Sequence, residues 1–188
     1  MKRGKIIVIV APSGTGKSTL IDKVQSEIND LKWSVSCTTR PIREGEVDGQ
    51  DYFFISKEGF ISRRDNNEFI EWAEVHSNFY GTLKSFVDDG LEKGDKLLFD
   101  LDVQGCDSIK SIYGDEANVI FIEPPSVDEL EKRLLSRATD SIEVIKERVG
   151  NARKELLRKD DFDYNVINDD FDNAYKSLLN TIKEIIRS

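Results

Sequence analysis

The amino-acid sequence predicts an α/β fold, in which a mostly parallel sheet lies between two layers of helices. Three observations lead to this prediction. A short apolar run leads through a glycine-rich loop into a helix, strand patterns alternate with helical patterns along most of the chain, and 188 residues with 38% hydrophobic content can bury one large core. Parallel strands need crossover connections, which are usually helices that cover the sheet. We therefore expect one unit with room for an inserted subdomain.

The first elements form a β-α-β pattern. Residues 5–10, "KIIVIV", are almost entirely apolar and predict a buried strand that enters the glycine-rich loop directly. The stretch "KSTLIDKVQSEI" then places apolar residues at helical spacing, and "WSVSC" at 33–37 alternates briefly as a strand does. These three elements are expected to start the parallel sheet.

The pattern changes between residue 38 and about residue 90. A polar loop ends in an aromatic strand in "TTRPIREGEVDGQDYFFIS". A short helix near 57–65, the segment "EFIEWAEVH" and another helix after "YGTLKS" follow. We interpret this part as an inserted small α+β subdomain at about 37–91.

The main alternation then resumes and continues to the end of the chain. The strand "KLLFDLD", a helix at "VQGCDSIKSIYG" and the strand "NVIFIE" are followed by a turn at Pro124 and Pro125. Two long helical patterns come next, "SVDELEKRLLSR" and "SIEVIKERVGNARKELL", before the strand "YNVIN" and a terminal helix over about 170–187. The predicted core therefore covers about 1–36, 92–136 and 149–188.

Charge and composition limit the function. A net charge of −9 and a pI near 4.8 do not favour a nucleic-acid backbone as partner, so an anion must be bound by a local group of cations. Cys37, Cys106 and His76 lack the spacing of a zinc site, and two cysteines indicate a reducing, cytoplasmic compartment rather than a disulfide scaffold. No apolar stretch is long enough to span a membrane or to form a signal peptide.

The loop after the first strand predicts a phosphate site. Its sequence "APSGTGKS" at 11–18 matches the Walker A motif, except that Ala11 replaces the first Gly. Backbone N–H groups are expected to bind the β-phosphate, Lys17 to span the β and γ oxygens, and Ser18 to ligate Mg²⁺. A glycine-rich turn that binds nothing is the alternative. The residues expected around the nucleoside triphosphate here are Ala11, Pro12, Ser13, Gly14, Thr15, Gly16, Lys17, Ser18 and Thr19.

A second anion site is predicted by the arginines of "SCTTRPIREGE". Arg40 and Arg43 lie three residues apart on an irregular loop near hydroxyl groups, and guanidinium groups can bind phosphate bidentately. The alternative is a solvated turn in which the arginines pair with Glu44 and Glu46. From the residues alone, neither interpretation is preferred.

Two aspartates follow at the end of the strand "KLLFDLD". Residues i and i+2 of a strand share a face, so Asp100 and Asp102 are expected to point into the same cleft at the carboxyl end of the sheet. Asp100 could hold Mg²⁺ through water, and either acid could accept a hydrogen bond from a ligand N–H. An ordinary salt bridge is the alternative for each.

Taken together, the motifs are similar to those of the guanylate kinases in order and spacing. The resemblance is carried by "APSGTGKST", "SxxTTRPxRxGE", "GxDYxF", "EFIEWAEV", "YGT", "DLDxQG", "FIEPPSxxELEKRL" and "VINDDFDxAY", and it covers nearly the whole chain. It implies a P-loop NTPase-type three-layer fold, a GMP-binding subdomain at 37–91 and a helical lid at about 137–148. The implied reaction is ATP + GMP to ADP + GDP with Mg²⁺. Only small-molecule substrates are expected as partners of a monomer or homodimer, with no nucleic acid and no membrane.

The resemblance also implies how the acceptor nucleotide is bound. Guanine offers N1–H and its 2-amino group as donors, so Glu71 and Asp102 would accept from them and the Thr82 hydroxyl would donate to O6. The phosphate would be held by Ser36, Arg40, Arg43, Tyr52 and Tyr80. The full set implied for GMP is Ser36, Arg40, Arg43, Tyr52, Glu71, Tyr80, Gly81, Thr82, Asp100 and Asp102.

The lid and the donor base complete the implied site. Arg133 and Arg137 are spaced i, i+4 on one predicted helix, and Arg148 lies on the next segment. With Lys17 and Arg40 they form the implied catalytic set, and the alternative for each lid arginine is a solvated helix face paired with glutamates. Asn168 would lie near the adenine of ATP, with a plain turn as its alternative.

Two other functions stay open from the sequence. A guanylate-kinase-like interaction module would share the fold but lack the donor loop or the lid arginines, which this chain retains. A related P-loop kinase acting on a sugar phosphate would not need Glu71 and Thr82 as a pair that reads a base. Activity with GMP that survives Glu71→Gln would favour the sugar-phosphate kinase.

Overall fold

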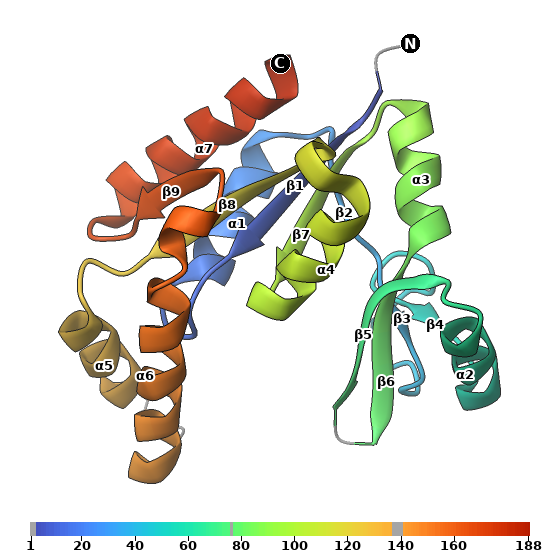
Figure 1. The fold of residues 1–188 in the computed structure, drawn as a ribbon, viewed down its shortest axis with the longest axis horizontal. Helices are drawn as coiled ribbons and strands as arrows, with labels where there is room; N and C mark the ends of the chain where they lie inside the picture. The colour runs from blue at the N-terminus through green and yellow to red at the C-terminus, as the bar shows by residue number, and fades with distance from the viewer. Residues whose placement is uncertain (1–2, 76, 137–140) are drawn as a thin grey trace.

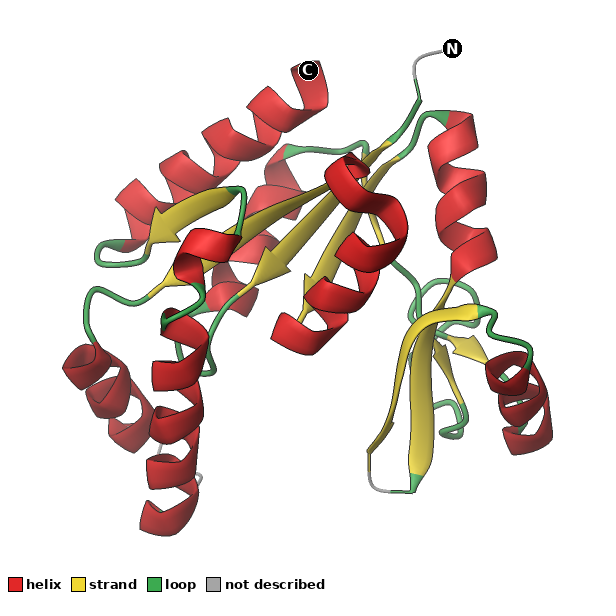
Figure 2. Ribbon diagram, viewed as in Figure 1, coloured by secondary structure: helices red, strands yellow, loops and turns green. Residues whose placement is uncertain are grey.

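The computed structural model describes residues 3–75, 77–136 and 141–188, and it confirms the α/β fold class (Figures 1 and 2). The main sheet has five strands in the order β2-β7-β1-β8-β9, and each adjacent pair is parallel. Its strands are β1 (Lys5–Val10), β2 (Leu31–Trp33), β7 (Lys96–Leu101), β8 (Ala117–Glu123) and β9 (Tyr164–Ile167). His76 and Arg137 lie outside the described residues.

The central strand β1 shows why helices cover both faces of this sheet. Ile7 and Ile9 belong to the core on one face, while Ile6, Val8 and Val10 belong to the core on the other. The first face is covered by α1 (Lys17–Glu27) and α7 (Phe171–Arg187), and the second by α3 (Lys84–Lys93) and α4 (Val103–Tyr113). The strand is therefore apolar from Ile6 to Val10, as expected of a parallel strand covered on both faces.

A second, smaller sheet forms a separate body beside the first (Figure 2). It contains β3 (Cys37–Thr38), β4 (Phe53–Phe54), β5 (Phe69–Val75) and β6 (Asn78–Leu83) in the order β4-β3-β6-β5, with α2 (Lys57–Asp65) packed on it. Its core is aromatic, because the ring of Phe60 stacks on those of Phe69 and Phe79 at centroid distances of 4.3 and 5.2 Å. These elements are the α+β insertion that the sequence predicts.

The strand expected at "WSVSC" is wrong as a single element. Trp33 ends β2 in the main sheet, whereas Cys37 begins β3 in the small sheet, so residues 34–36 cross from one sheet to the other. Alternation along a strand does not indicate which sheet its two ends join. The stretch "NFYGTL" was also not predicted as a strand, although it forms β6 and pairs with β5.

Two helices form a further small body near the glycine-rich loop. They are α5 (Val127–Ser136) and α6 (Ile142–Leu156), which bury Leu130, Leu134, Ile145, Val149 and Ala152 between them. Short 3₁₀ helices cover Gly114–Glu116 and Lys159–Asp161. In the described part of the chain, no helix has the length and apolar character needed to cross a membrane.

Candidate active site

The glycine-rich loop joins the end of β1 to the start of α1. Gly14 and Gly16 have φ values of 91° and 90°, a conformation that is costly for residues with a β-carbon. Thr15 is fully buried, and its hydroxyl donates to the carbonyl of Pro12 inside the loop. The Thr15 side chain therefore stabilises the loop from inside. Only the backbone of Thr15 is left to contact a bound phosphate.

Lys17 is fixed at the mouth of this loop. Its ammonium group forms an ion pair with the carboxylate of Asp100 on β7 and donates to the carbonyl of Leu101 at 3.3 Å. A cavity of about 360 Å³ lies beside it, lined by residues 11–19 together with Asp102 and Glu155. The predicted triphosphate-binding loop thus forms a continuous lining, with its lysine already oriented by an acid on the neighbouring strand.

Asp100 lies in β7 but Asp102 lies beyond its end, so the expectation that the two aspartates share one face of a strand is wrong. The strand ends at Leu101, and Asp102 begins α4, where its carboxylate accepts a hydrogen bond from the Gly105 amide at 2.7 Å. Asp100 lines a cavity toward the small sheet, whereas Asp102 lines the cavity of the glycine-rich loop. The sequence could not show this change of direction, because Asp102 also fits the apolar-polar pattern of the strand.

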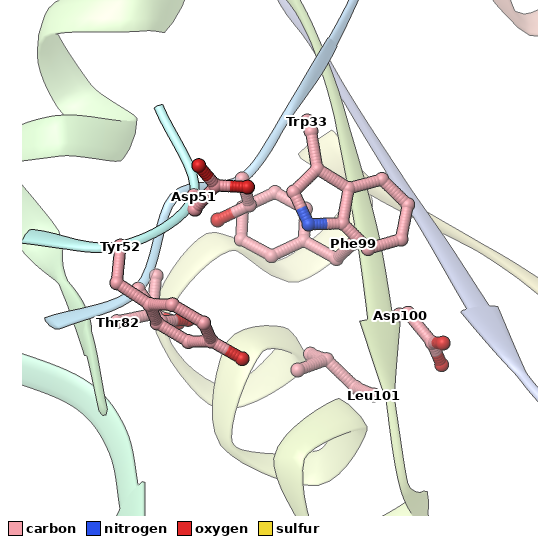
Figure 3. A pocket seen from close by; sticks show the side chains of 9 residues that line it. Trp33, Asp51, Tyr52, Thr82, Phe99, Asp100 and Leu101 are labelled. Carbon is pink, nitrogen blue, oxygen red and sulfur yellow. The ribbon is translucent and has the colours of Figure 1, made fainter. Parts of the chain in front are cut away.

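A second cavity, of about 260 Å³, lies between the two sheets (Figure 3). Tyr52 and Thr82 lie on one side of it, and Asp100 and Leu101 lie on the other. Of the residues predicted to bind GMP, Ser36, Tyr52, Thr82 and Asp100 line this cavity. Since Asp100 also pairs with Lys17, this cavity and the glycine-rich loop meet at one ion pair.

Five residues that the sequence did not single out also line this cavity: Trp33, Ser34, Asp51, Phe99 and Leu101. Ser34 is 7% exposed, and among the described residues its hydroxyl has no hydrogen-bond partner. The alternation of "WSVSC", which places Ser34 on the same side as Ser36, was the signal that could have found it.

A partly buried carboxylate, that of Glu71, lies beside Thr82. The Thr82 hydroxyl, which is 2% exposed, donates to Glu71 at 2.8 Å and lies 3.2 Å from the hydroxyl of Ser36. Burial raises the pKa of Glu71, the hydrogen bond from Thr82 lowers it in part, and the nearby Asp102 charge raises it further. A register shift in β5 between Phe69 and Glu71 accompanies this placement.

Gly81 has a structural reason to be glycine beside this carboxylate. A β-carbon at this position would lie 2.9 Å from the carbonyl oxygen of Glu71 and 3.0 Å from the β-carbon of Trp72, which faces it across the strand pair. Gly81 therefore allows β5 and β6 to approach closely where Glu71 and Thr82 meet.

Arg40 and two tyrosines form the predicted phosphate cluster. The Arg40 guanidinium lies 5.6 Å from the ring centroid of Tyr52, whose ring contacts that of Tyr80 at 5.9 Å. Arg40 is paired bidentately with Glu46 at 2.7 and 3.1 Å, and the amide of Arg43 donates to the same carboxylate at 2.7 Å. The alternative pairing with Glu46 is thus confirmed for Arg40, and the Arg43 side chain is exposed. Because guanidinium binds carboxylate and phosphate with the same geometry, this cluster is suited to an anion.

The remaining predicted residues lie around α5 and α6. Arg133 donates to the backbone carbonyl of Asn168 at 3.2 Å, and Asn168 is 7% exposed. Arg148 lies on α6, partly buried, and Arg137 is outside the described residues. Glu155 was not predicted, although it lies seven residues after Arg148 on the same helix and lines the loop cavity. Burial and the Asp102 charge raise the pKa of Glu155, while Lys17 lowers it in part.

Glu71→Gln is expected to stabilise the protein at neutral pH. The raised pKa means that folding disfavours the ionised carboxylate, so the contribution of Glu71 to stability is fully present below the ordinary pKa of 4.5 and is lost as the pH rises through the raised folded value. Denaturant titrations at pH 4 and pH 7 test this. The variant should gain on the wild type only at the higher pH, and an equal difference at both pH values would contradict a buried carboxylate.

Comparison with known protein families shows which family the chain belongs to. A family model described as guanylate kinase matches residues 3–185. The chain belongs to the guanylate kinase family. Its sequence is 46% identical over 179 residues to the guanylate kinase of Helicobacter hepaticus, covering 95% of this chain and 90% of the relative. It is 43% identical over 186 residues to that of Chlorobaculum tepidum, covering 99% and 95%.

A solved structure supports the same assignment. The crystal structure of guanylate kinase from Anaplasma phagocytophilum matches with a TM-score of 0.69 and 31% sequence identity, covering 100% of this chain and 88% of that one. The P-loop NTPase-type fold implied by the sequence motifs is thus confirmed. The residues of the two cavities described above lie within the part of the chain that the guanylate kinase family model covers.

Proposed function

We propose that this guanylate kinase family member transfers the γ-phosphoryl group of ATP to the phosphate of GMP, giving ADP and GDP. The observation that carries the proposal is the partly buried Glu71 carboxylate, which accepts a hydrogen bond from Thr82 at the edge of a cavity bordered by the Lys17–Asp100 pair. Glu71 would thus read the base in the same site in which the glycine-rich loop would hold the triphosphate.

The acceptor end of the site suits guanine better than adenine. A carboxylate offers only lone pairs, so Glu71 can accept from guanine N1–H and the 2-amino group, with Asp102 as a second acceptor. Adenine has a bare lone pair at N1, and leaving a buried charged acceptor unpaired costs about 1–3 kcal/mol. Selectivity would thus come from unpaired polar groups more than from the size of the cavity.

The phosphate of GMP is assigned to the cluster around Arg40. Ser36 and Tyr52 line the acceptor cavity, and their hydroxyls, the hydroxyl of Tyr80 and the guanidinium groups of Arg40 and Arg43 would supply the donors. Glu46 would keep the Arg40 guanidinium oriented by its bidentate pair until the phosphate joins it.

The donor end is assigned to the glycine-rich loop with Mg²⁺. Ser18 lines the loop cavity and Asp100 lies at the carboxyl end of β7, so a hydroxyl and a carboxylate are the oxygen donors near Lys17. Within the described residues, no group of three or more acidic, Cys or His side chains forms a metal cage. This fits Mg²⁺, which keeps several waters and takes few protein ligands, and Asp100 would act through one of them. When bound, Mg²⁺ would neutralise charge on the donor phosphates.

Transfer in this site needs alignment and positive charge. The acceptor oxygen of a nucleoside monophosphate is already ionised at neutral pH, so no general base is required. Arg133, Arg137 and Arg148 would surround the migrating group when the lid at about 137–148 and the subdomain at about 37–91 close, which also excludes water. We further propose a cytoplasmic location, small-molecule substrates only, and a monomer or homodimer.

The acceptor preference tests this proposal directly. ADP release should be measured with GMP, AMP, CMP and UMP at equal concentrations, with ATP and Mg²⁺ in excess. GMP is expected to be preferred over AMP by about tenfold to a hundredfold for each unpaired contact. A different preferred acceptor would refute the assignment, and no ADP release with any of them, together with no ATP binding in calorimetry, would favour an interaction module.

A further inference from the structure

Asn168 is the first residue after β9, and its backbone and side chain are both bonded to other parts of the site. Its amide N–H donates to the carbonyl of Glu123 at 2.8 Å, which extends the pairing of β9 with β8. Its side-chain amide donates to the carbonyl of Thr15 at 2.6 Å, and its backbone carbonyl accepts from Arg133 at 3.2 Å. With 7% exposure, this residue faces the glycine-rich loop from inside the protein.

The hydrogen bond to Thr15 fixes the peptide that precedes Lys17. In a planar trans peptide, the carbonyl of one residue and the N–H of the next point in opposite directions. Because the Thr15 carbonyl is held toward Asn168, the N–H of Gly16 must point away from it. The fit is tight, since a β-carbon at Gly16 would lie 2.8 Å from the Asn168 side-chain nitrogen. Asn168 can therefore set the direction of one of the backbone donors expected to bind phosphate.

The same residue joins α5 to the loop. Arg133 reaches Asn168 from α5, and the side chain of Leu134 on that helix lies over Gly14, where a β-carbon would be 2.8 Å from it. Asn168 is thus hydrogen-bonded both to the helix that carries Arg133 and to the loop that carries Lys17. A substitution of the Asn168 side chain would remove the hydrogen bond to Thr15 and release the Gly16 amide, whereas Arg133 bonds to the backbone carbonyl, which the substitution keeps. The acceptor cavity has no lining residue among these contacts.

We propose that the Asn168 side chain positions the donor phosphates by holding the Thr15–Gly16 peptide. This inference rests on the proposed binding of ATP at the loop. It differs from the contact with adenine expected from the sequence, because a phosphate-positioning residue affects all donors equally, whatever their base. The distinction can be measured with a ligand that has no base at all.

Asn168→Ala is the first test. Affinities for Mg²⁺–ATP, Mg²⁺–tripolyphosphate and GMP should be measured by calorimetry. Loss of one buried hydrogen bond is expected to weaken ATP and tripolyphosphate by the same factor, about tenfold. The affinity for GMP should stay within about twofold, because the hydrogen bonds of Asn168 to Thr15, Arg133 and Glu123 do not involve residues that line the acceptor cavity. In turnover, KM for ATP should rise and kcat should fall, with KM for GMP unchanged. A loss of ATP affinity with unchanged tripolyphosphate affinity would overturn the proposal in favour of an adenine contact.

Two further variants make the test independent of folding. Asn168→Asp keeps the shape of the side chain but sets a carboxylate against the Thr15 carbonyl, so it should weaken tripolyphosphate at least as much as Asn168→Ala. Asn165→Ala, at an exposed position of β9, is the matched control and should change neither affinity. If both Asn168 variants also lost GMP affinity, the role would be general stability and the proposal would be wrong. The two proposals can fail separately, because tripolyphosphate can bind without any transfer to GMP. If the wild type did not phosphorylate GMP, the proposed function would be refuted, and the binding measurements would still decide the role of Asn168.

Discussion

Glu71→Gln is expected to lower kcat/KM for GMP about a hundredfold. The amide can still accept the hydrogen bond from Thr82, so the local structure should be kept. Its NH₂ group, however, would meet one of the two N–H donors of guanine, and a pair of facing donors replaces a charge-assisted hydrogen bond. A loss of about 3 kcal/mol is expected from such a change, which corresponds to about a hundredfold. Initial rates with GMP and with AMP measure it.

The loss should appear mainly in KM, because Glu71 contacts the base and not the reacting phosphate. The preference for GMP over AMP should fall with it, since AMP does not use the carboxylate. Glu74→Gln is the matched control, because Glu74 is an exposed residue of the same strand and carries the same change of charge. If Glu71→Gln kept the activity of the wild type with GMP, the base-reading role would be refuted and a sugar-phosphate kinase would be favoured.

The parts of the fold that depend on neighbouring residues could be predicted from the sequence. The strand at Lys5–Val10 and the helix from Lys17 follow from a continuous apolar run and from helical spacing, and the loop between them from its glycines. Each of these patterns is complete within about ten residues, so no distant contact is needed to interpret it. The same holds for α2 at Lys57–Asp65, which starts with the side chain of Ser56 as its N-cap.

The relations between distant segments could not be predicted in the same way. The ion pair between Lys17 and Asp100 joins α1 to β7, and the step of the chain from β2 to β3 passes between two sheets. Neither leaves a periodic pattern, because each depends on which strands become neighbours. The position of Asn168 is a further example. The sequence placed it correctly at a strand end, but its side chain turns inward to Thr15, and only the packing of β9 beside β8 brings the two together.

Replacing Lys17 by Ala is expected to remove nearly all turnover, with kcat lowered about a hundredfold to a thousandfold, while GMP binding stays largely intact. Lys17 is the cation of the glycine-rich loop, and removing one group that stabilises developing charge in a water-excluded site costs about a hundredfold to a thousandfold. Lys17 does not line the acceptor cavity, so its loss should not remove a contact with GMP. Steady-state rates and calorimetry with GMP measure the two effects separately.

Lys23→Ala is the matched control for this prediction, because Lys23 is an exposed residue of the same helix and the substitution removes the same charge. Its turnover should equal that of the wild type. The ion pair with Asp100 adds a second expectation: in Lys17→Ala that carboxylate loses its partner, so Lys17→Ala combined with Asp100→Asn should recover stability but no activity. Equal turnover of Lys17→Ala and the wild type would show that the loop does not hold the donor phosphates. The negative charge that develops on the transferred phosphoryl group needs a cation beside it, and Lys17 is the cation of this loop.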